Sequence, residues 1–299
     1  MIALLFLFFQ DQQVDFSADA LYDQLEFFAG HKAMTLGFEF FHYRTCTFEL
    51  LDDILFCDLL TDVGFINAAV MVAKMKPCAI AIFAPVCSSW IFVSRHKTGR
   101  STAYPLGIVQ YGAVHQANIM VTRCVLLILL LVAKGGIFVL ENPQPSSIFR
   151  RPAFQMMPRL LRIFTYTLDL RRLGATTKKP ITCYSNVPWL HELEEFFYVR
   201  MPTAQLTGPT TTKVWNDEQG KWKVTGVADR LKETQRYPIG FGRAMAQLFR
   251  RNGRCLIPEE LSDEWVGHCD LRVAQLLCDL SGADLFEDAC LASVFEFLE

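Results

Sequence analysis

Short β-like apolar runs alternate with longer helix-compatible stretches from Leu21 onward, and this alternation restricts the fold more than any other feature of the sequence. The expected strands are residues 24–28, 45–50, 79–84, 136–140 and 164–169, and the expected helices are residues 31–43, 62–74, 112–133 and 148–162. Strands that alternate with helices of this length predict an α/β fold built on a parallel sheet. With 299 residues, 52% of them hydrophobic, the chain can bury the core of one large domain or two small ones.

Three of the expected strands end in residues that a buried strand rarely contains. The first runs into Ala29-Gly30, the third into Pro85-Val86-Cys87 and the fourth into Glu141-Asn142-Pro143. Open α/β sheets bind their ligands at the carboxyl ends of the strands. We therefore expect these three strand ends to converge on one functional site.

The first strand end has the features of a nucleoside-binding turn. Gly30 permits a ligand to approach the backbone closely, and the N-terminus of the expected helix follows it. Glu49 comes about 20 residues later, where an acidic side chain binds ribose hydroxyls in Rossmann-like sites. Asp52, Asp53 and Asp58 are alternatives for the same role.

The third and fourth strand ends place a thiol and a carboxyl group on what we expect to be neighbouring strands. Cys87 is followed by small polar residues and then by the cations Arg95, His96, Lys97 and Arg100. Cationic surroundings lower the pKa of a thiol and make it a nucleophile, which predicts a reactive Cys87. Glu141, beside the amide of Asn142, could donate a proton or act as a hydrogen-bonding clamp. A buried structural cysteine is the alternative for any one of the ten cysteines.

Charge is strongly segregated along the chain. Residues 1–62 carry 11 acidic and 2 basic residues, residues 63–254 carry 9 acidic and 26 basic residues, and residues 255–299 carry 11 acidic residues and Arg272. A middle segment with a net charge of +17 suits a polyanion such as nucleic acid. The acidic tail could compete for that basic surface or could form a solvated helical face.

Other features argue against a membrane protein, a disulfide scaffold and a metalloprotein. The apolar run at residues 2–9 is too short for a bilayer span, and the run at 125–133 is tightly bracketed by Arg123 and Lys134, which favours a buried helix. The cysteines form no CxxC pair, and no histidine stands at zinc-ligand spacing. We expect a reducing compartment, no metal and no membrane association.

The sequence motifs, in order, resemble those of cytosine-5 DNA methyltransferases that use S-adenosyl-L-methionine, and more narrowly the divergent methyltransferase-like proteins of dinoflagellate and other algal genomes. The matching motifs are Phe28-Ala29-Gly30, Glu49-Leu50, Asp58, Pro85-Val86-Cys87 and Glu141-Asn142-Pro143. The match runs from about Leu25 to Asn186 and returns at Tyr237–Phe249, which resembles a late helix that closes the cofactor pocket.

The resemblance implies a Rossmann-like methyltransferase fold divided into five segments. These are a leader (1–20), a catalytic and cofactor domain (21–183), a short variable or reduced target-recognition region (184–236), a returning helix (237–257) and an acidic helical tail (258–299). It also implies an intracellular protein, nuclear if it acts on DNA.

The resemblance further assigns roles to individual residues. Phe28, Ala29, Gly30, Glu49, Leu50 and Asp58 would bind S-adenosyl-L-methionine, and Cys87, with Glu141 and Asn142, would methylate C5 of cytosine in DNA, or less favourably in RNA. Arg95 would contact substrate. Where the family has an arginine-containing segment that grips the base and the phosphate, Lys178 and Lys179 are the stand-ins here.

Two alternatives stay open. One is a catalytically decayed methyltransferase fold that binds nucleic acid or a protein, which the missing arginines favour, whereas the presence of both Cys87 and Glu141 favours the enzyme. The other is a methyltransferase of a different substrate class in which Cys87 is only structural.

Overall fold

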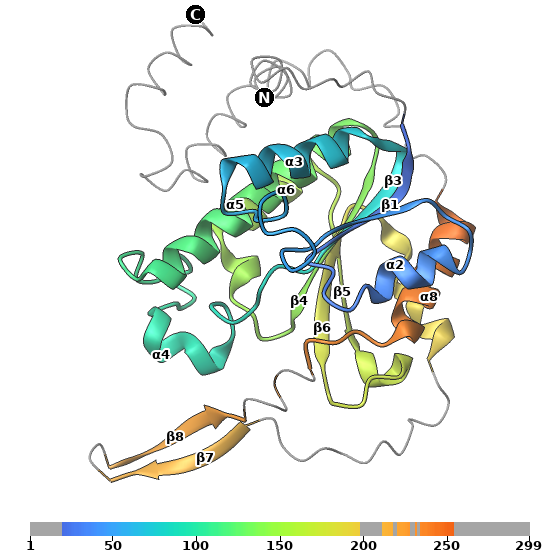
Figure 1. Ribbon diagram of the computed structural model, residues 1–299. Helices are drawn as coiled ribbons and strands as arrows, with labels where there is room; N and C mark the ends of the chain where they lie inside the picture. The colour runs from blue at the N-terminus through green and yellow to red at the C-terminus, as the bar shows by residue number, and fades with distance from the viewer. Residues whose placement is uncertain (1–19, 198–210, 218–219, 228–230, 232–233, 254–299) are drawn as a thin grey trace, which may run out of the picture.

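A central six-stranded sheet organises the chain (Figure 1). The computed structural model describes residues 20–197, 211–217, 220–227, 231 and 234–253. The strand order is β2-β1-β3-β4-β6-β5. The strands are β1 (Tyr22–Phe27), β2 (Thr45–Phe48), β3 (Met75–Phe83), β4 (Ile137–Pro143), β5 (Phe164–Asp169) and β6 (Pro180–Ser185).

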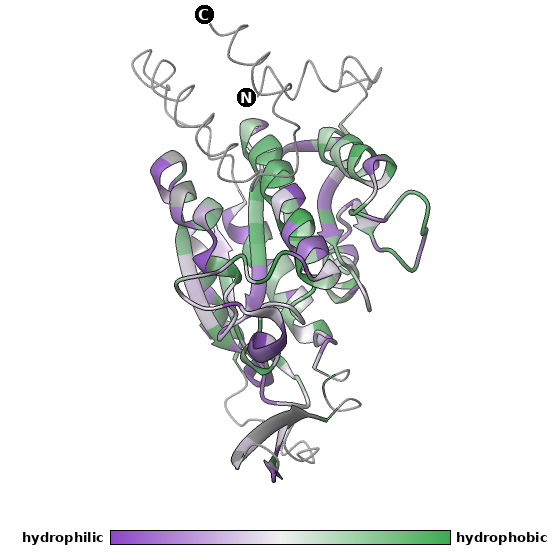
Figure 2. Ribbon diagram, turned by 90° about the vertical axis from the view of Figure 1, so that its left-hand side faces the viewer, coloured by the Kyte–Doolittle hydropathy of each residue, from purple (hydrophilic) through white to green (hydrophobic). Residues whose placement is uncertain are grey.

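Helices cover both faces of this sheet. On one face lie α3 (Asp62–Ala73), α5 (Gly112–Ala133) and α6 (Pro152–Leu160), packed on strand residues such as Phe27, Phe83 and Leu140. On the other lie α2 (Ala33–Glu39), α8 (Ile239–Asn252), η3 (Leu170–Leu173) and η4 (Pro188–Phe196), packed on Ile82, Val139 and other strand residues. This is a doubly wound, Rossmann-like α/β fold, and it confirms the expected fold class. Hydrophobic colour gathers in the sheet and the inner helices in Figure 2.

The central strands are buried on both faces, which explains their sequences. Successive residues of β3 contribute alternately to the two cores, with Ala81 and Phe83 on one side and Ile80 and Ile82 on the other. A strand covered by helices on both faces has no polar face, so it reads as a continuous apolar run. The strands β1–β2, β1–β3 and β3–β4 pair in parallel, and Ile137–Leu140 of β4 is likewise a buried apolar run.

The helix α5 contains the apolar run at residues 125–133, which we expected to form a buried helix. Among the described residues it is the one helix long and apolar enough to cross a membrane by length and composition, and 56% of its most apolar window lies inside the fold. It lies against α3 and β4. A helix of this kind that is mostly buried inside the fold is a core helix.

The helices α2 and α8 pack closely because two glycines face each other. A Cβ on Gly37 would lie 2.2 Å from the carbonyl carbon of Gly242, and a Cβ on Gly242 would lie 1.9 Å from the carbonyl oxygen of Ala33. No other residue type fits at such a contact. The close packing fixes the start of α8, and with it the preceding Tyr237, against the sheet.

The structure corrects the prediction of a parallel sheet. The strand β6 is antiparallel to both β4 and β5, between which it lies, so the sheet is mixed. This strand was not among the expected ones, because it begins at Pro180 in a stretch where turn-forming residues increase. Every residue after Pro180 in β6 is buried.

Several element boundaries also differ from expectation. The helix α2 covers seven of the residues expected at 31–43, since the backbone at Lys32 and His42 is left-handed. The segment expected as one helix at 148–162 is divided into η2 (Ile148–Arg150) and α6. Two short elements, η1 (Phe92–Ser94) and α4 (Arg95–Thr98), follow β3, and within 184–236 a separate hairpin forms from β7 (Thr211–Asn216) and β8 (Lys221–Gly226). The leader, apart from residue 20, and the tail at 258–299 lie outside the described residues.

Candidate active site

Four parallel strands end in one row, and the candidate site residues follow that row. In the sheet register Phe48 pairs with Phe27, Phe27 with Phe83, and Phe83 with Leu140. The residues that come next are Glu49 after β2, Phe28–Gly30 after β1, Ala84–Cys87 after β3 and Glu141–Asn142 in β4. The fold therefore brings the three predicted strand ends to one edge of the sheet.

Asn142 joins the two strand ends that carry the thiol and the carboxyl group. It is 1% exposed, and its Nδ2 donates a hydrogen bond of 3.0 Å to the carbonyl oxygen of Pro85. Beyond Cys87 the chain turns back at once, because the Trp90 N–H donates to the Cys87 carbonyl at 2.8 Å. The structure thus gives Asn142 a positioning contact on the loop that carries the half-buried Cys87.

Glu141 is a buried carboxyl group with one oxygen bound and one oxygen without a partner. It is 3% exposed, and its Oε2 accepts a hydrogen bond from the hydroxyl of Tyr237. Its Oε1 and the Oδ1 of Asn142 are buried and have no hydrogen-bond partner in the described part of the chain. Unpartnered buried acceptors are costly, so two on consecutive residues indicate a place where a ligand donates hydrogen bonds.

Burial raises the pKa of Glu141, against the opposing effects of the nearby Lys179 charge and the Tyr237 hydrogen bond. The carboxyl group is thereby biased toward its protonated form, which can donate a hydrogen bond as well as accept one. This fits the proton-donating role expected for Glu141 from the sequence.

The expected lowering of the Cys87 pKa is wrong for the chain by itself. Burial raises the pKa of this thiol, and the charge of Glu141 raises it further. Lys179 is the cation that opposes the rise. Arg100, which we expected nearby, is instead 2% exposed, and its guanidinium lies 3.4 Å from the centre of the Trp90 ring while donating to Ser89, Asn118 and backbone carbonyls.

Tyr237 is the site residue that the sequence did not single out. It precedes α8 by two residues, and it carries the hydroxyl that binds Glu141. The Lys179 ammonium lies 4.1 Å from the centre of its ring. Burial and the charge of Glu141 hold the pKa of Tyr237 well above its usual value, so the hydroxyl remains a donor. The only sequence signal was the position of Tyr237 at the start of the returning helix.

The three residues predicted to bind substrate, Arg95, Lys178 and Lys179, lie in different surroundings. Lys179 belongs to the cluster around Glu141, whereas Lys178 is exposed. Arg95 begins α4 and lies over the Phe92 ring at 5.4 Å, with its Nε buried and unpartnered within the described residues. Cys183 on β6 stands opposite Glu141 in the sheet register and is fully buried.

The turn after β1 has the conformation that a close ligand contact needs. Phe28, Gly30 and Lys32 all have positive φ angles, of 60°, 48° and 55°. A Cβ on Gly30 would meet no atom within 4 Å, so open space lies beside the turn. The Ala29 carbonyl closes the turn by accepting from the Lys32 N–H at 2.7 Å. Left-handed residues other than glycine are strained and concentrate at functional sites.

Glu49 lies against this turn, as the sequence predicted for a ribose-binding acid. Its Oε2 accepts from the Gly30 N–H at 2.7 Å, and its Oε1 accepts from the Leu51 N–H at 3.3 Å. The Leu50 side chain is 44% exposed at the same strand end. Asp52, one of the alternative acids, forms an ion pair with Lys32 at 2.7 Å.

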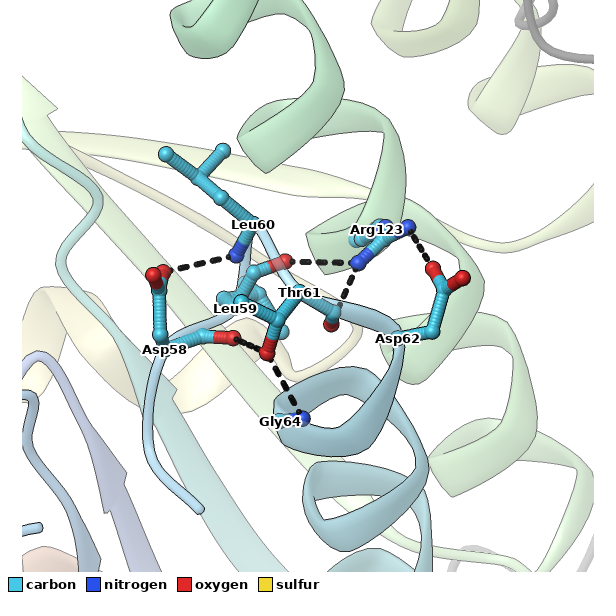
Figure 3. Close-up of polar contacts among 7 residues, drawn as sticks. All are labelled: Asp58, Leu59, Leu60, Thr61, Asp62, Gly64 and Arg123. Carbon is cyan, nitrogen blue, oxygen red and sulfur yellow. Dashed lines mark hydrogen bonds and ion pairs between the residues drawn. The ribbon is translucent and has the colours of Figure 1, made fainter. Parts of the chain in front are cut away.

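Asp58 orders the loop that leads into α3 (Figure 3). Its Oδ1 accepts from the Leu60 N–H at 2.9 Å, and its carbonyl oxygen accepts from the Thr61 hydroxyl at 3.0 Å. Arg123 of α5 holds the same loop by donating to the carbonyl oxygens of Leu59 and Thr61 and pairing with Asp62. These contacts give Asp58 a loop-forming role, and its contact with the cofactor stays a prediction.

No group of three or more His, Cys, Asp or Glu residues in the described part of the chain could hold a metal ion. The side chains gathered around Glu141 offer a thiol (Cys87), a carboxyl group (Glu141), a tyrosine hydroxyl (Tyr237) and an ammonium group (Lys179).

The sequence matches no protein-family model and no curated protein. Among solved structures, the crystal structure of S. pombe Dnmt2 methyltransferase is similar to this chain, with a TM-score of 0.37 and 11% sequence identity. The matched region covers 60% of this chain and 56% of that chain. This chain thus spans little more than half the length of that protein.

Proposed function

We propose that this protein transfers a methyl group from S-adenosyl-L-methionine to C5 of cytosine in DNA, through a nucleophilic cysteine. The observation that carries the proposal is that Cys87 and Glu141 lie at the ends of adjacent strands and that, within the described residues, one buried oxygen of Glu141 has no hydrogen-bond partner. A cytosine ring offers its C6 to the thiol, and it offers a ring nitrogen and an amino group to the buried oxygens of Glu141 and Asn142. The basic middle segment supplies the charge that a nucleic-acid substrate needs.

The turn at Gly30 fits a nucleoside cofactor. Open space lies beside Gly30, and the Glu49 carboxylate stands at the same turn, where it could exchange its backbone hydrogen bonds for ribose hydroxyls. Gly30 and Glu49 are therefore the residues we assign to S-adenosyl-L-methionine. When bound, this cofactor supplies an electrophilic methyl group on a sulfonium.

The residues around Glu141 would activate the base. Protonated Glu141 would donate to N3, which makes C6 of the ring more electrophilic. The Cys87 sulfur would then add to C6. Electron density then collects at C5, the carbon to be methylated. C5 would then bond to the methyl group that the cofactor supplies, as the bond from that methyl group to the sulfonium sulfur breaks. Loss of the C5 proton to solvent, return of the N3 proton to Glu141 and expulsion of the Cys87 thiolate would restore the aromatic ring and free the enzyme.

The raised pKa values of Cys87 and Glu141 indicate that only one of the two groups carries a negative charge at a time. Two acidic groups that repel each other do not both ionise readily, and Lys179 stabilises a charge on either of them. With Glu141 protonated, the charge that Lys179 stabilises can reside on the thiolate. The same arrangement thus provides both the nucleophile and the proton donor.

Methyl incorporation from labelled cofactor would test this function. Duplex DNA and single-stranded RNA of the same sequence would be compared with DNA whose cytosines already carry a 5-methyl group. We expect label to enter the unmodified DNA, Cys87→Ser to lose incorporation with cofactor affinity unchanged, and Glu141→Gln to reduce it. Label in the pre-methylated DNA, or equal incorporation by Cys87→Ser, would reject the mechanism.

A nucleic-acid-binding module without catalysis is the second candidate. The observation that favours it is the raised pKa of Cys87, which leaves the thiol protonated in the chain by itself. Binding of DNA without methyl incorporation, in protein that also binds the cofactor, would make this the better account.

A further inference from the structure

The hairpin β7–β8 is a two-stranded sheet separate from the central one. It projects from the body of the fold on the side where α4 lies (Figure 1). A two-stranded hairpin is only marginally stable by itself in water. Contact with a partner would therefore stabilise it.

Two tryptophans face each other across this hairpin. Trp215 pairs directly with Trp222 in the antiparallel register, and their rings lie 5.4 Å apart at an angle of 71°. They are 46% and 64% exposed, whereas Trp90 and Trp189 in the body of the fold are 1% and 6% exposed. Two adjacent exposed indoles are an uncommon surface for a protein with no ligand for them.

Cations flank the tryptophan pair. Lys213 precedes Trp215 by two residues, which places it on the same face of β7. The strand β8 lies near η1, and η1 leads directly into α4, which carries Arg95, His96 and Lys97. The Nε of Arg95, which lies in this same segment, is buried and has no hydrogen-bond partner in the described part of the chain. The segment η1 starts five residues after Cys87, so the loop that carries Cys87 leads into the element that β8 contacts.

We propose that Trp215 and Trp222 form a stacking platform for an unpaired base of a nucleic-acid strand, whose neighbouring phosphates contact Lys213 and the cations of α4. Aromatic rings beside cations are what single-stranded nucleic acids require, since every base has a face to stack and every linkage a charge to neutralise. This inference rests on the proposed function for the kind of substrate. It adds the element that would hold a strand beside the active site.

A protein partner fits the surface less well. The exposed rings alone would suit an apolar partner, but the cations of α4 and Lys213 beside them would remain uncompensated. Association of two copies of this chain through the tryptophans is thus an outcome that the experiment must separate from nucleic-acid binding.

Quenching of tryptophan emission in the full chain would test the platform. A single-stranded 12-nucleotide oligonucleotide would be titrated against an abasic strand of the same length, which has the same charge and no bases. We expect the base-bearing strand to quench emission and the abasic strand to bind more weakly with little quenching. A Trp215→Phe/Trp222→Phe double variant, which retains two rings, would assign the quenching to this pair.

Affinity of variants supplies the second readout. Trp222→Ala should weaken binding of the base-bearing strand about 5- to 100-fold, as expected for the loss of one stacked base, while Trp222→Phe keeps most of the affinity. Phe40→Ala, which removes an exposed ring at the end of α2, is the matched control and should leave binding unchanged. Circular dichroism would confirm that each variant is folded.

Three results would overturn the inference: equal quenching by the abasic strand, unchanged affinity of Trp222→Ala, or light scattering that shows dimers dissociated by the tryptophan substitutions. Its failure is distinguishable from failure of the proposed function. Stacking without methyl transfer supports the platform and rejects the enzyme, whereas methyl transfer with unchanged affinity of Trp222→Ala supports the enzyme and rejects the platform.

Discussion

Replacing Tyr237 with phenylalanine removes one hydroxyl and leaves the ring contacts in place. The ring lies 5.9 Å from that of Phe241 and beneath the Lys179 ammonium, and phenylalanine retains both contacts. The substitution removes the donor to the Glu141 Oε2, so neither carboxyl oxygen has a hydrogen-bond partner among the residues that the structure describes.

The cost depends on the charge of Glu141. Where the carboxyl group is protonated, the lost hydrogen bond is between neutral groups and contributes about 1 kcal/mol; where it is ionised, the loss is about 2 to 3 kcal/mol. Burial raises the folded-state pKa of Glu141, so its contribution to stability is complete below the unfolded value and declines as pH rises through the folded value. The Tyr237 hydrogen bond opposes that rise, so its loss moves the folded pKa still higher.

Urea unfolding of the parent and of Tyr237→Phe at pH 5 and pH 8 would measure this effect. We expect the variant to lose more stability at pH 8 than at pH 5. Tyr166→Phe is the matched control, because Tyr166 also donates to a carboxylate, Glu194, at 2.8 Å, but in an exposed setting. Its loss should be under about 1 kcal/mol. A larger loss at pH 5 than at pH 8 for Tyr237→Phe would refute the buried-carboxyl reasoning, because it would require the hydrogen bond to be stronger when the carboxyl group is protonated.

Two further substitutions, each with its own control, test the site. Lys179→Met removes the cation that opposes the rise in the Cys87 pKa, so alkylation of Cys87 by iodoacetamide should shift to higher pH, while Lys178→Met at an exposed position should leave the profile unchanged. Gly30→Ala forces a side chain onto a backbone with φ of +48°, which should cost about 1 to 2 kcal/mol in thermal unfolding. Gly112→Ala, at the start of α5 with no atom within 4 Å of the added Cβ, is its control and should be neutral or stabilising. Gly30→Ala should also weaken binding of S-adenosyl-L-methionine in calorimetry, whereas unchanged affinity would remove Gly30 from the cofactor site.

The alternation of apolar runs was enough to predict the fold class and most of the parallel strands. It worked because strand segments buried on both faces must be apolar, as residues 79–83 of β3 and 137–140 of β4 are. The strand ends at Gly30, Cys87 and Glu141 could be predicted to meet, since parallel strands share a carboxyl edge. These were local patterns with a direct physical cause.

The rest depended on contacts between distant residues. The antiparallel β6 begins with a proline and follows a turn, so its burial between β4 and β5 has no local signal. The hydrogen bond from Tyr237 joins residues 96 apart in sequence, and it exists because Gly37 and Gly242 let α8 approach the sheet. The Cys87 pKa was predicted to fall from the cations nearby in sequence, but burial and Glu141 determine it in the fold.

Mass spectrometry of a trapped complex tests the central claim most directly. The protein would be incubated with S-adenosyl-L-methionine and DNA containing 5-fluorocytosine, whose fluorine cannot leave as a proton does, so a nucleophilic cysteine remains bonded to the base. We predict a denaturation-resistant adduct that maps to Cys87 and is absent in Cys87→Ser. Methylation of ordinary cytosine without an adduct at Cys87 would contradict the cysteine mechanism.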